Sequence, residues 1–130
     1  MNYLGIDLGG TNIVAAVVNE KYEIVSETKN PTLCPRPWEE ILDDVAKTAV
    51  EAANLANLKI SDFAFVGIGS PGVISVETGT VIVAVNLGFE NVPLTKYVSE
   101  KLGVPVILEN DANAAAFGEY KAGKAKNTTN

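Results

Sequence analysis

The N-terminal part of the chain contains three short strand-like segments joined by links of only a few residues. Residues 3–8 and 13–18 are apolar runs, and residues 23–28 alternate between apolar and polar side chains, which is typical of strands. Links this short can join antiparallel strands, whereas a parallel crossover needs a dozen or more residues. We therefore expect the chain to begin with a three-stranded antiparallel meander, which limits every fold that can follow.

After the meander, helical patterns alternate with buried strands. Residues 38–56 have apolar side chains at helical spacing, and residues 63–69 and 104–109 are apolar runs suited to strands covered on both faces. We also expect a hairpin over residues 73–85, a helix over 93–102, an Ala-rich helix over 111–120 and a polar tail over 124–130. This order predicts an α/β fold, a mixed five-stranded sheet with an extra hairpin and three helices. It resembles one lobe of the ribonuclease-H-like, actin-like ATPase fold.

Charge and residue content exclude several classes of function. The chain of 130 residues carries 10 Lys and Arg against 16 Asp and Glu, a net charge of −6, so no nucleic-acid partner is expected. It has no His and a single Cys, Cys34, which removes histidine catalysis, intrachain disulfides and Cys-rich zinc sites. No segment has the pattern of a membrane span or a signal peptide. We therefore expect a cytoplasmic protein that uses carboxylates, Lys or Tyr for acid–base chemistry.

The first candidate site is the string Asp7-Leu8-Gly9-Gly10-Thr11-Asn12, at the end of the first strand. Glycines can take positive φ, which lets backbone N–H groups converge on an anion, and a threonine adds a hydroxyl donor. Asp7 would repel a bare phosphate, so we expect Mg²⁺ between them, bound through water. A plain hairpin turn is the alternative. Against it, a carboxylate in an apolar strand is costly to bury without a partner.

A second glycine-rich stretch, Gly67-Ile68-Gly69-Ser70-Pro71-Gly72, matches the G-x-G-x-x-G fingerprint of dinucleotide-binding proteins. That motif needs a helix to begin at its glycines, whereas the residues that follow are β-branched and favour a strand. We therefore reject dinucleotide binding. Two interpretations of the loop stay open: its bare backbone approaches a ligand such as a sugar hydroxyl, or it is only a turn.

The second candidate site is Glu109-Asn110-Asp111-Ala112-Asn113, between an apolar strand and the last predicted helix. One Asn or Asp would be enough to cap a helix. Four polar residues in five exceed that need, and they follow the carboxyl end of a strand, where open α/β sheets bind ligands. Asp111 is suited to accept the proton of an alcohol, and Asn110 to form hydrogen bonds with adjacent hydroxyls.

These motifs, in this order, resemble the ROK family of sugar kinases and sugar-responsive repressors. The resemblance covers nearly the whole chain and is carried by residues 7–11, 69–72, 86–94 and 109–116. It implies ATP and Mg²⁺ as cofactors and a catalytic base at Asp111. The phosphate and metal contacts that it implies are Asp7, Gly9, Gly10, Thr11 and Asn12, with Asp7 on the metal, and the sugar contacts are Gly72, Asn86, Asn110 and Asp111.

The resemblance also predicts what surrounds this chain. Family members are about twice as long, and their second half supplies another phosphate loop and the adenosine contacts. We therefore expect residues 1–123 to be the N-terminal lobe of an ATP-dependent hexose kinase of the glucokinase type, with residues 124–130 leading toward a missing C-terminal lobe. The expected partners are a sugar substrate and that lobe, and formation of a homo-oligomer stays open. The 130-residue chain alone is expected to be inactive.

Two other functions remain alternatives. The chain could be a fragment of a sugar-sensing repressor, although such members carry a DNA-binding segment before the Asp-Gly-Gly turn and only six residues precede Asp7. It could also be an actin-like ATPase lobe that acts through protein partners. That class shares the phosphate turn but lacks the Asn110-Asp111 pair.

Overall fold

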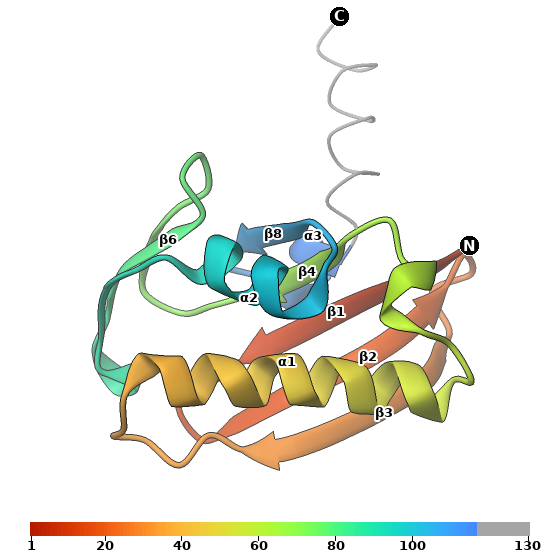
Figure 1. Ribbon diagram of the computed structural model, residues 1–130, viewed down its shortest axis with the longest axis horizontal. Coiled ribbons are helices and arrows are strands. Elements are labelled where there is room, and N and C mark those ends of the chain that lie inside the picture. Colours follow the sequence, from red (N-terminus) through yellow and green to blue (C-terminus); the bar gives the residue numbers. More distant parts are fainter. Residues whose placement is uncertain (117–130) are drawn as a thin grey trace, which may run out of the picture.

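The computed structural model describes residues 1–116, in which the short N-terminal links form the predicted antiparallel meander (Figure 1). The larger sheet contains, in spatial order, β3 (Ile24–Pro31), β2 (Asn12–Asn19), β1 (Asn2–Leu8), β4 (Val66–Gly69) and β8 (Val106–Glu109). The meander pairs are antiparallel, whereas β4 runs parallel to both β1 and β8. The described residues thus form the mixed five-stranded sheet that the sequence predicts.

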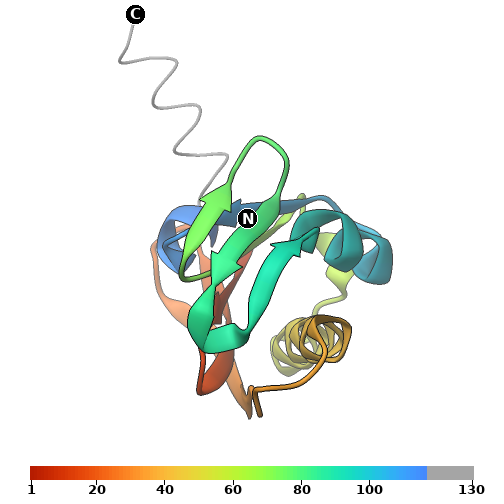
Figure 2. The same ribbon diagram turned by 90° about the vertical axis from the view of Figure 1, so that its left-hand side faces the viewer.

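Helices cover both faces of this sheet. The described helices are α1 (Trp38–Leu55), α2 (Leu94–Leu102) and α3 (Ala112–Ala116). Viewed from the side in Figure 2, α1 and α2 lie on one side of the larger sheet and α3 on the other. The predicted last helix extends to residue 120, and the predicted boundary between residues 123 and 124 follows it. The part of that helix beyond Ala116 and the predicted boundary both lie outside the described residues.

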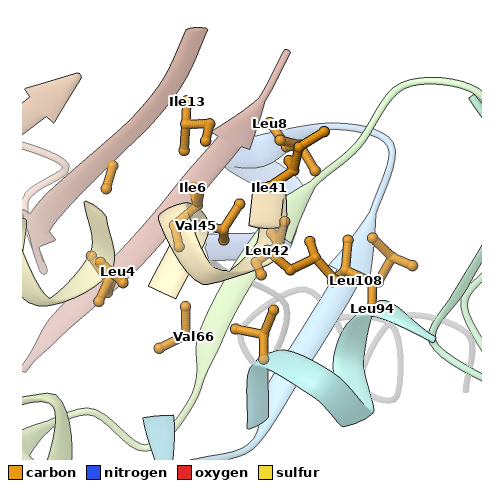
Figure 3. Close-up of a cluster of buried hydrophobic side chains, with 14 of the residues drawn as sticks. Leu4, Ile6, Leu8, Ile13, Ile41, Leu42, Val45, Val66, Leu94 and Leu108 are labelled. Atoms are coloured by element: carbon orange, nitrogen blue, oxygen red, sulfur yellow. The ribbon is translucent and has the colours of Figure 1, made fainter. Parts of the chain in front are cut away.

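The core lies between the larger sheet and α1. Successive side chains of a strand point to opposite faces, so Leu4, Ile6 and Leu8 of β1 all point toward α1, and each is fully buried. Figure 3 shows these side chains meeting those of α1, α2 and the neighbouring strands, among them Ile13, Ile41, Leu42, Val45, Val66, Leu94 and Leu108. The alternate residues of β1, which include Gly5 and Asp7, therefore lie on the opposite face.

A smaller sheet stands beside the larger one (Figure 2). The predicted hairpin forms its strands β5 (Val73–Ser75) and β6 (Thr80–Ala84), and a further strand, β7 (Phe89–Val92), pairs with β6. The sequence did not indicate β7, which follows a short 3₁₀ turn over Val85–Leu87. None of the helices in residues 1–116 is long and apolar enough to cross a membrane.

Candidate functional site

The strand register brings the two candidate motifs to one edge of the larger sheet. Asp7 on β1 lies opposite Gly69 on β4, and Gly69 lies opposite Glu109 on β8. These three parallel strands therefore end together, and the Ser70 N–H continues the ladder by donating to the Glu109 carbonyl oxygen at 2.9 Å. Adjacent strands lie about 5 Å apart, so the ends of β1 and β8 are separated by roughly 10 Å.

A groove of about 780 Å³ lies on the sheet face opposite α1, and its lining includes Asp7 of the first motif and two residues of the second. Asp7, Asn110 and Asp111 line it, together with Gly5 of β1 and Val14 of β2. Asp7 is exposed rather than buried. A buried carboxylate was predicted at this position, and that prediction is wrong, since the described residues leave this side of the strand uncovered. Asp7 and Asp111 thus face a common space.

The turn after β1 is tight, but its glycines do not take the backbone conformation that the sequence suggested. Positive φ occurs at other glycines of the described chain, whereas Gly9 and Gly10 lack it. Close packing instead explains why glycines stand at these two positions. A Cβ on Gly10 would lie 3.2 Å from the Asn86 Cβ, and one on Gly9 would lie 3.1 Å from the Asn12 carbonyl oxygen. The Gly9 N–H donates to that same oxygen at 2.9 Å.

The G-x-G-x-x-G stretch is a strand followed by a loop, and no helix begins at its glycines. Gly67 and Gly69 allow α3 to approach β4: a Cβ on Gly67 would lie 2.1 Å from the Ala115 backbone, and one on Gly69 would lie 2.4 Å from the Ala112 nitrogen. Gly72 has a φ of 91°, and its Cβ would lie 2.0 Å from the Val83 carbonyl oxygen. These glycines thus serve contacts within the lobe, and the rejected dinucleotide fingerprint has no structural basis.

Asn110 holds the loop that follows β4. Its Nδ2 donates to the carbonyl oxygens of Ser70 at 3.1 Å and Gly72 at 3.0 Å. A side-chain amide has two N–H donors and one carbonyl acceptor. Both donor directions are therefore taken up within the chain, and Oδ1 is the atom that can accept a hydrogen bond from a ligand hydroxyl.

Asp111 caps α3 and also faces the groove. Its Oδ1 accepts a hydrogen bond from the Ala114 N–H at 3.1 Å, and its carbonyl oxygen accepts one from the Ala115 N–H at 3.0 Å. The capping role considered from the sequence is therefore present. It is compatible with acid–base chemistry, because Asp111 is an exposed residue of the groove wall.

The predicted sugar contacts fall into two groups. Gly72 lies beside Asn110, as its carbonyl contact shows. Asn86 instead packs against Gly10 of the turn after β1 and is exposed. Thr11 is exposed and Asn12 begins β2 half-buried. All the predicted site residues thus lie around one sheet edge, with Asn86 at the turn end.

Two residues that contact the turn were missed in the sequence. The Thr32 hydroxyl donates to the Gly9 carbonyl oxygen at 2.7 Å, and the Cys34 sulfur lies 2.9 Å from the Gly10 carbonyl oxygen. Their segment reads only as a Pro-rich loop. The pairing of the predicted strands could have indicated Thr32, because this residue directly follows β3, and β3 pairs with β2, the strand that leaves the turn.

A magnesium ion fits the turn end as an ion held mostly by water and phosphate. Within residues 1–116, no three Cys, Asp or Glu side chains cluster as a metal ligand set. Mg²⁺ often keeps several waters and binds through one or two carboxylates plus substrate phosphates. Asp7, which ends β1 beside the turn and is exposed, is suited to that limited role.

Comparison with known proteins identifies the family. The model of the ROK family matches residues 3–130. The chain belongs to the ROK family. It is similar to a glucokinase of Streptomyces coelicolor, with 42% identity over 127 residues that cover 98% of this chain and 38% of that protein. It is also 35% identical, over 116 residues, to a putative xylose repressor of a Caldicellulosiruptor species, covering 89% of this chain and 29% of that protein.

A solved structure gives the same fold. The ROK family glucokinase of Streptomyces griseus in complex with glucose and AMPPNP matches with a TM-score of 0.75 and 38% identity, over 92% of this chain and 36% of that one. The predicted actin-like ATPase lobe is thereby confirmed. This ROK chain spans well under half the length of these relatives.

Proposed function

We propose that this ROK chain is the N-terminal lobe of an ATP-dependent sugar kinase that transfers the γ-phosphate to a hydroxyl of a hexose, with glucose as the first candidate. The observation that carries the proposal is the common groove of Asp7 and Asp111, at the ends of strands two positions apart. A phosphate-holding turn next to the groove and a carboxylate base within it are what transfer to an alcohol needs. The similarity to glucokinases supports glucose.

In this proposal the two ends of the sheet edge have different tasks. Asp111 accepts the proton of the attacking sugar hydroxyl, and Asn110 accepts a hydrogen bond from a neighbouring hydroxyl through Oδ1. The turn at Gly9, Gly10 and Thr11 holds phosphate oxygens through backbone N–H groups and the Thr11 hydroxyl. Mg²⁺, when bound near Asp7, neutralises charge on the phosphates. Phosphoryl transfer depends mainly on positioning and charge stabilisation, so the chain contributes most by fixing these groups relative to one another.

The second part of the proposal is that a C-terminal lobe completes the groove. The chain covers 38% of the similar Streptomyces coelicolor glucokinase, and the described residues leave Asp7, Asn110 and Asp111 exposed. Exposed groups around a reaction would admit water, which enzymes of this type exclude by closure of a second wall. The isolated 130-residue chain is therefore proposed to be inactive.

A repressor role is the second candidate, since a putative xylose repressor is also similar. A kinase would phosphorylate a sugar and a repressor would not, so sugar-dependent turnover of ATP distinguishes the two candidates. We would assay the complete protein that contains this chain with Mg·ATP and a set of hexoses, in parallel with the 130-residue chain. The expected result is sugar-dependent ADP formation by the complete protein and none by the isolated chain.

Three results would contradict parts of this proposal. Sequence-specific DNA binding without turnover would favour the repressor. ATP hydrolysis that is indifferent to sugar would favour an ATPase lobe. Robust sugar phosphorylation by the isolated chain would overturn the requirement for a second lobe while leaving the kinase assignment intact.

A further inference from the structure

A short segment after β3 contacts the carbonyl groups of Gly9, Gly10 and Thr11 in the proposed phosphate turn. The Thr32 hydroxyl donates to the Gly9 oxygen at 2.7 Å, and the Thr32 N–H donates to the Thr11 oxygen at 2.9 Å. Between them, the Cys34 sulfur lies 2.9 Å from the Gly10 oxygen. Three consecutive carbonyls of the turn are therefore directed at the same short segment.

This arrangement determines where the N–H groups of the turn point. In a trans peptide the C=O and N–H of one unit point in opposite directions. The Gly9 carbonyl shares its peptide unit with the Gly10 N–H, and the Gly10 carbonyl shares its unit with the Thr11 N–H. Both N–H groups therefore point away from Thr32 and Cys34, on one side of the turn. Successive N–H groups on one side form an anion-binding concavity.

The contacting segment is itself fixed to helix α1. Arg36 donates from Nε at 3.0 Å and from Nη2 at 2.8 Å to the Thr32 carbonyl oxygen. The same guanidinium forms an ion pair with Asp44 of α1, and both side chains are partly shielded from solvent. Thr32 is fully buried. A continuous set of hydrogen bonds thus runs from α1 through Arg36 and Thr32 to the turn.

We propose that Thr32 is a positioning residue for nucleotide binding, and that Arg36 fixes it in place. Thr32 touches no phosphate in this arrangement; it holds the Gly9 and Thr11 carbonyls so that the neighbouring N–H groups face the phosphate. The proposal rests on the proposed kinase function for the identity of the anion. Loss of the hydroxyl frees the Gly9 carbonyl, so the turn no longer presents its N–H groups in a single direction before the nucleotide binds.

The test compares Thr32→Val with Thr32→Ser in the complete protein. Valine keeps the shape of threonine and removes the donor, whereas serine keeps the donor. Thr48→Val is the matched control, because Thr48 is also fully buried and its hydroxyl also donates to a backbone carbonyl, that of Asp44 at 2.6 Å, away from the turn. The measurements are the Kd for Mg·AMPPNP by calorimetry, the KM for glucose, and the Tm.

We expect Thr32→Val to weaken AMPPNP binding about tenfold, the effect of one lost hydrogen bond to a buried group. Thr32→Ser should bind AMPPNP as the wild type does. In both variants the KM for glucose should change less than about twofold, which is smaller than the effect of losing one such hydrogen bond. Thr48→Val should lower the Tm without changing the Kd. An unchanged Kd in Thr32→Val, or an equal loss in Thr48→Val, overturns the proposal.

A second variant covers the case in which Thr32→Val does not fold. Arg36→Met removes both donors to the Thr32 carbonyl from a less buried position, and should weaken AMPPNP binding by about two- to tenfold. The same Kd as in the wild type would contradict the positioning role. If the wild type binds AMPPNP but phosphorylates no sugar, the kinase proposal fails while the comparison of variants still decides the role of Thr32. If the wild type does not bind AMPPNP, both fail.

Discussion

The two ends of this sheet edge are held by different forces. At the turn end, hydrogen bonds from Thr32, Cys34 and the segment around them hold the backbone by its carbonyl oxygens. At the Asp111 end, close packing holds the backbone, because α3 lies against glycines whose hydrogen atoms leave room for it. The turn end therefore depends mainly on hydrogen bonds to its carbonyl oxygens, whereas the Asp111 end depends mainly on the close approach of α3, with the Asn110 amide holding the adjoining loop.

This difference shows which substitutions disturb which end. Removing a hydroxyl without changing volume should disturb the turn and leave the packed end intact. Adding a single methyl group at the β4 glycines should do the reverse, since cores at this density resist added volume. In the proposed kinase, the first change should affect the nucleotide and the second the sugar chemistry.

The largest effect is expected at Asp111. Asp111→Asn keeps an oxygen that can cap α3 but removes the base, so kcat of the complete protein should fall by about 10²- to 10⁴-fold. The Kd for AMPPNP should stay close to the wild-type value. Steady-state kinetics with glucose, together with a thermal melt to show an intact fold, check this. Activity within tenfold of the wild type would remove Asp111 from the role of base.

Gly69→Ala tests the packed end. The new Cβ would lie 2.4 Å from the Ala112 nitrogen and 2.8 Å from the Asp111 carbonyl carbon, so the backbone that carries the base has to move. A displacement of about 1 Å can reduce the rate about 10²-fold. We therefore expect kcat to fall much more than AMPPNP affinity, measured by kinetics and calorimetry.

Gly103→Ala is the control for that experiment. Gly103 ends α2 with a φ of 76°, and within residues 1–116 no atom other than those of its chain neighbours lies within 4 Å of an added Cβ. An alanine there meets strain but no neighbour, which should cost about 1 kcal/mol of stability and leave kcat unchanged. An equal loss of kcat in both glycine variants would mean that Gly69 acts only through general stability.

Asn110→Asp tests the loop contact. The substitution replaces the Nδ2 donor with an oxygen that faces the carbonyls of Ser70 and Gly72, so the loop should separate from the Asn110 side chain. The KM for glucose should rise about tenfold, in line with the loss of one or two hydrogen bonds. Asn30→Asp is the control, since the Asn30 amide donates to Thr48 away from the groove edge. A glucose KM that is unchanged would contradict a sugar-side role for Asn110.

The smallest effect separates the two roles of Asp111. Asp111→Ala removes the cap on the Ala114 N–H as well as the base. Its free energy of unfolding, measured in urea, should be about 1 kcal/mol lower than that of Asp111→Asn, which is the usual contribution of a helix cap. Equal stability of the two variants would show that the cap contributes nothing measurable.

Much of the fold could be predicted because its signals are local. Short links require the meander, and the apolar runs identify the strands that lie between helices. Strand β7 could not be predicted, because its four residues show no clear alternation and it follows a left-handed Gly88. The strand is defined by its pairing with β6, and its own sequence carries no strand pattern.

The position of the site could be predicted from the sequence, but its contacts could not. The register brings residues that end parallel strands to one edge, so the polar clusters after β1 and β8 had to lie near each other. The exposure of Asp7 depends on what covers a sheet face, and the engagement of the Asn110 amide depends on carbonyls about forty residues away. Such contacts leave no mark on the local sequence.

The most direct test of the account titrates two variants of the complete protein, Thr32→Val and Asn110→Asp, each with Mg·AMPPNP and with glucose. If the ends are held separately, Thr32→Val loses affinity for the nucleotide and keeps its affinity for glucose, and Asn110→Asp does the opposite. Equal losses for both ligands in both variants would show that the edge responds as one unit, and would contradict the separation of a nucleotide end from a sugar end.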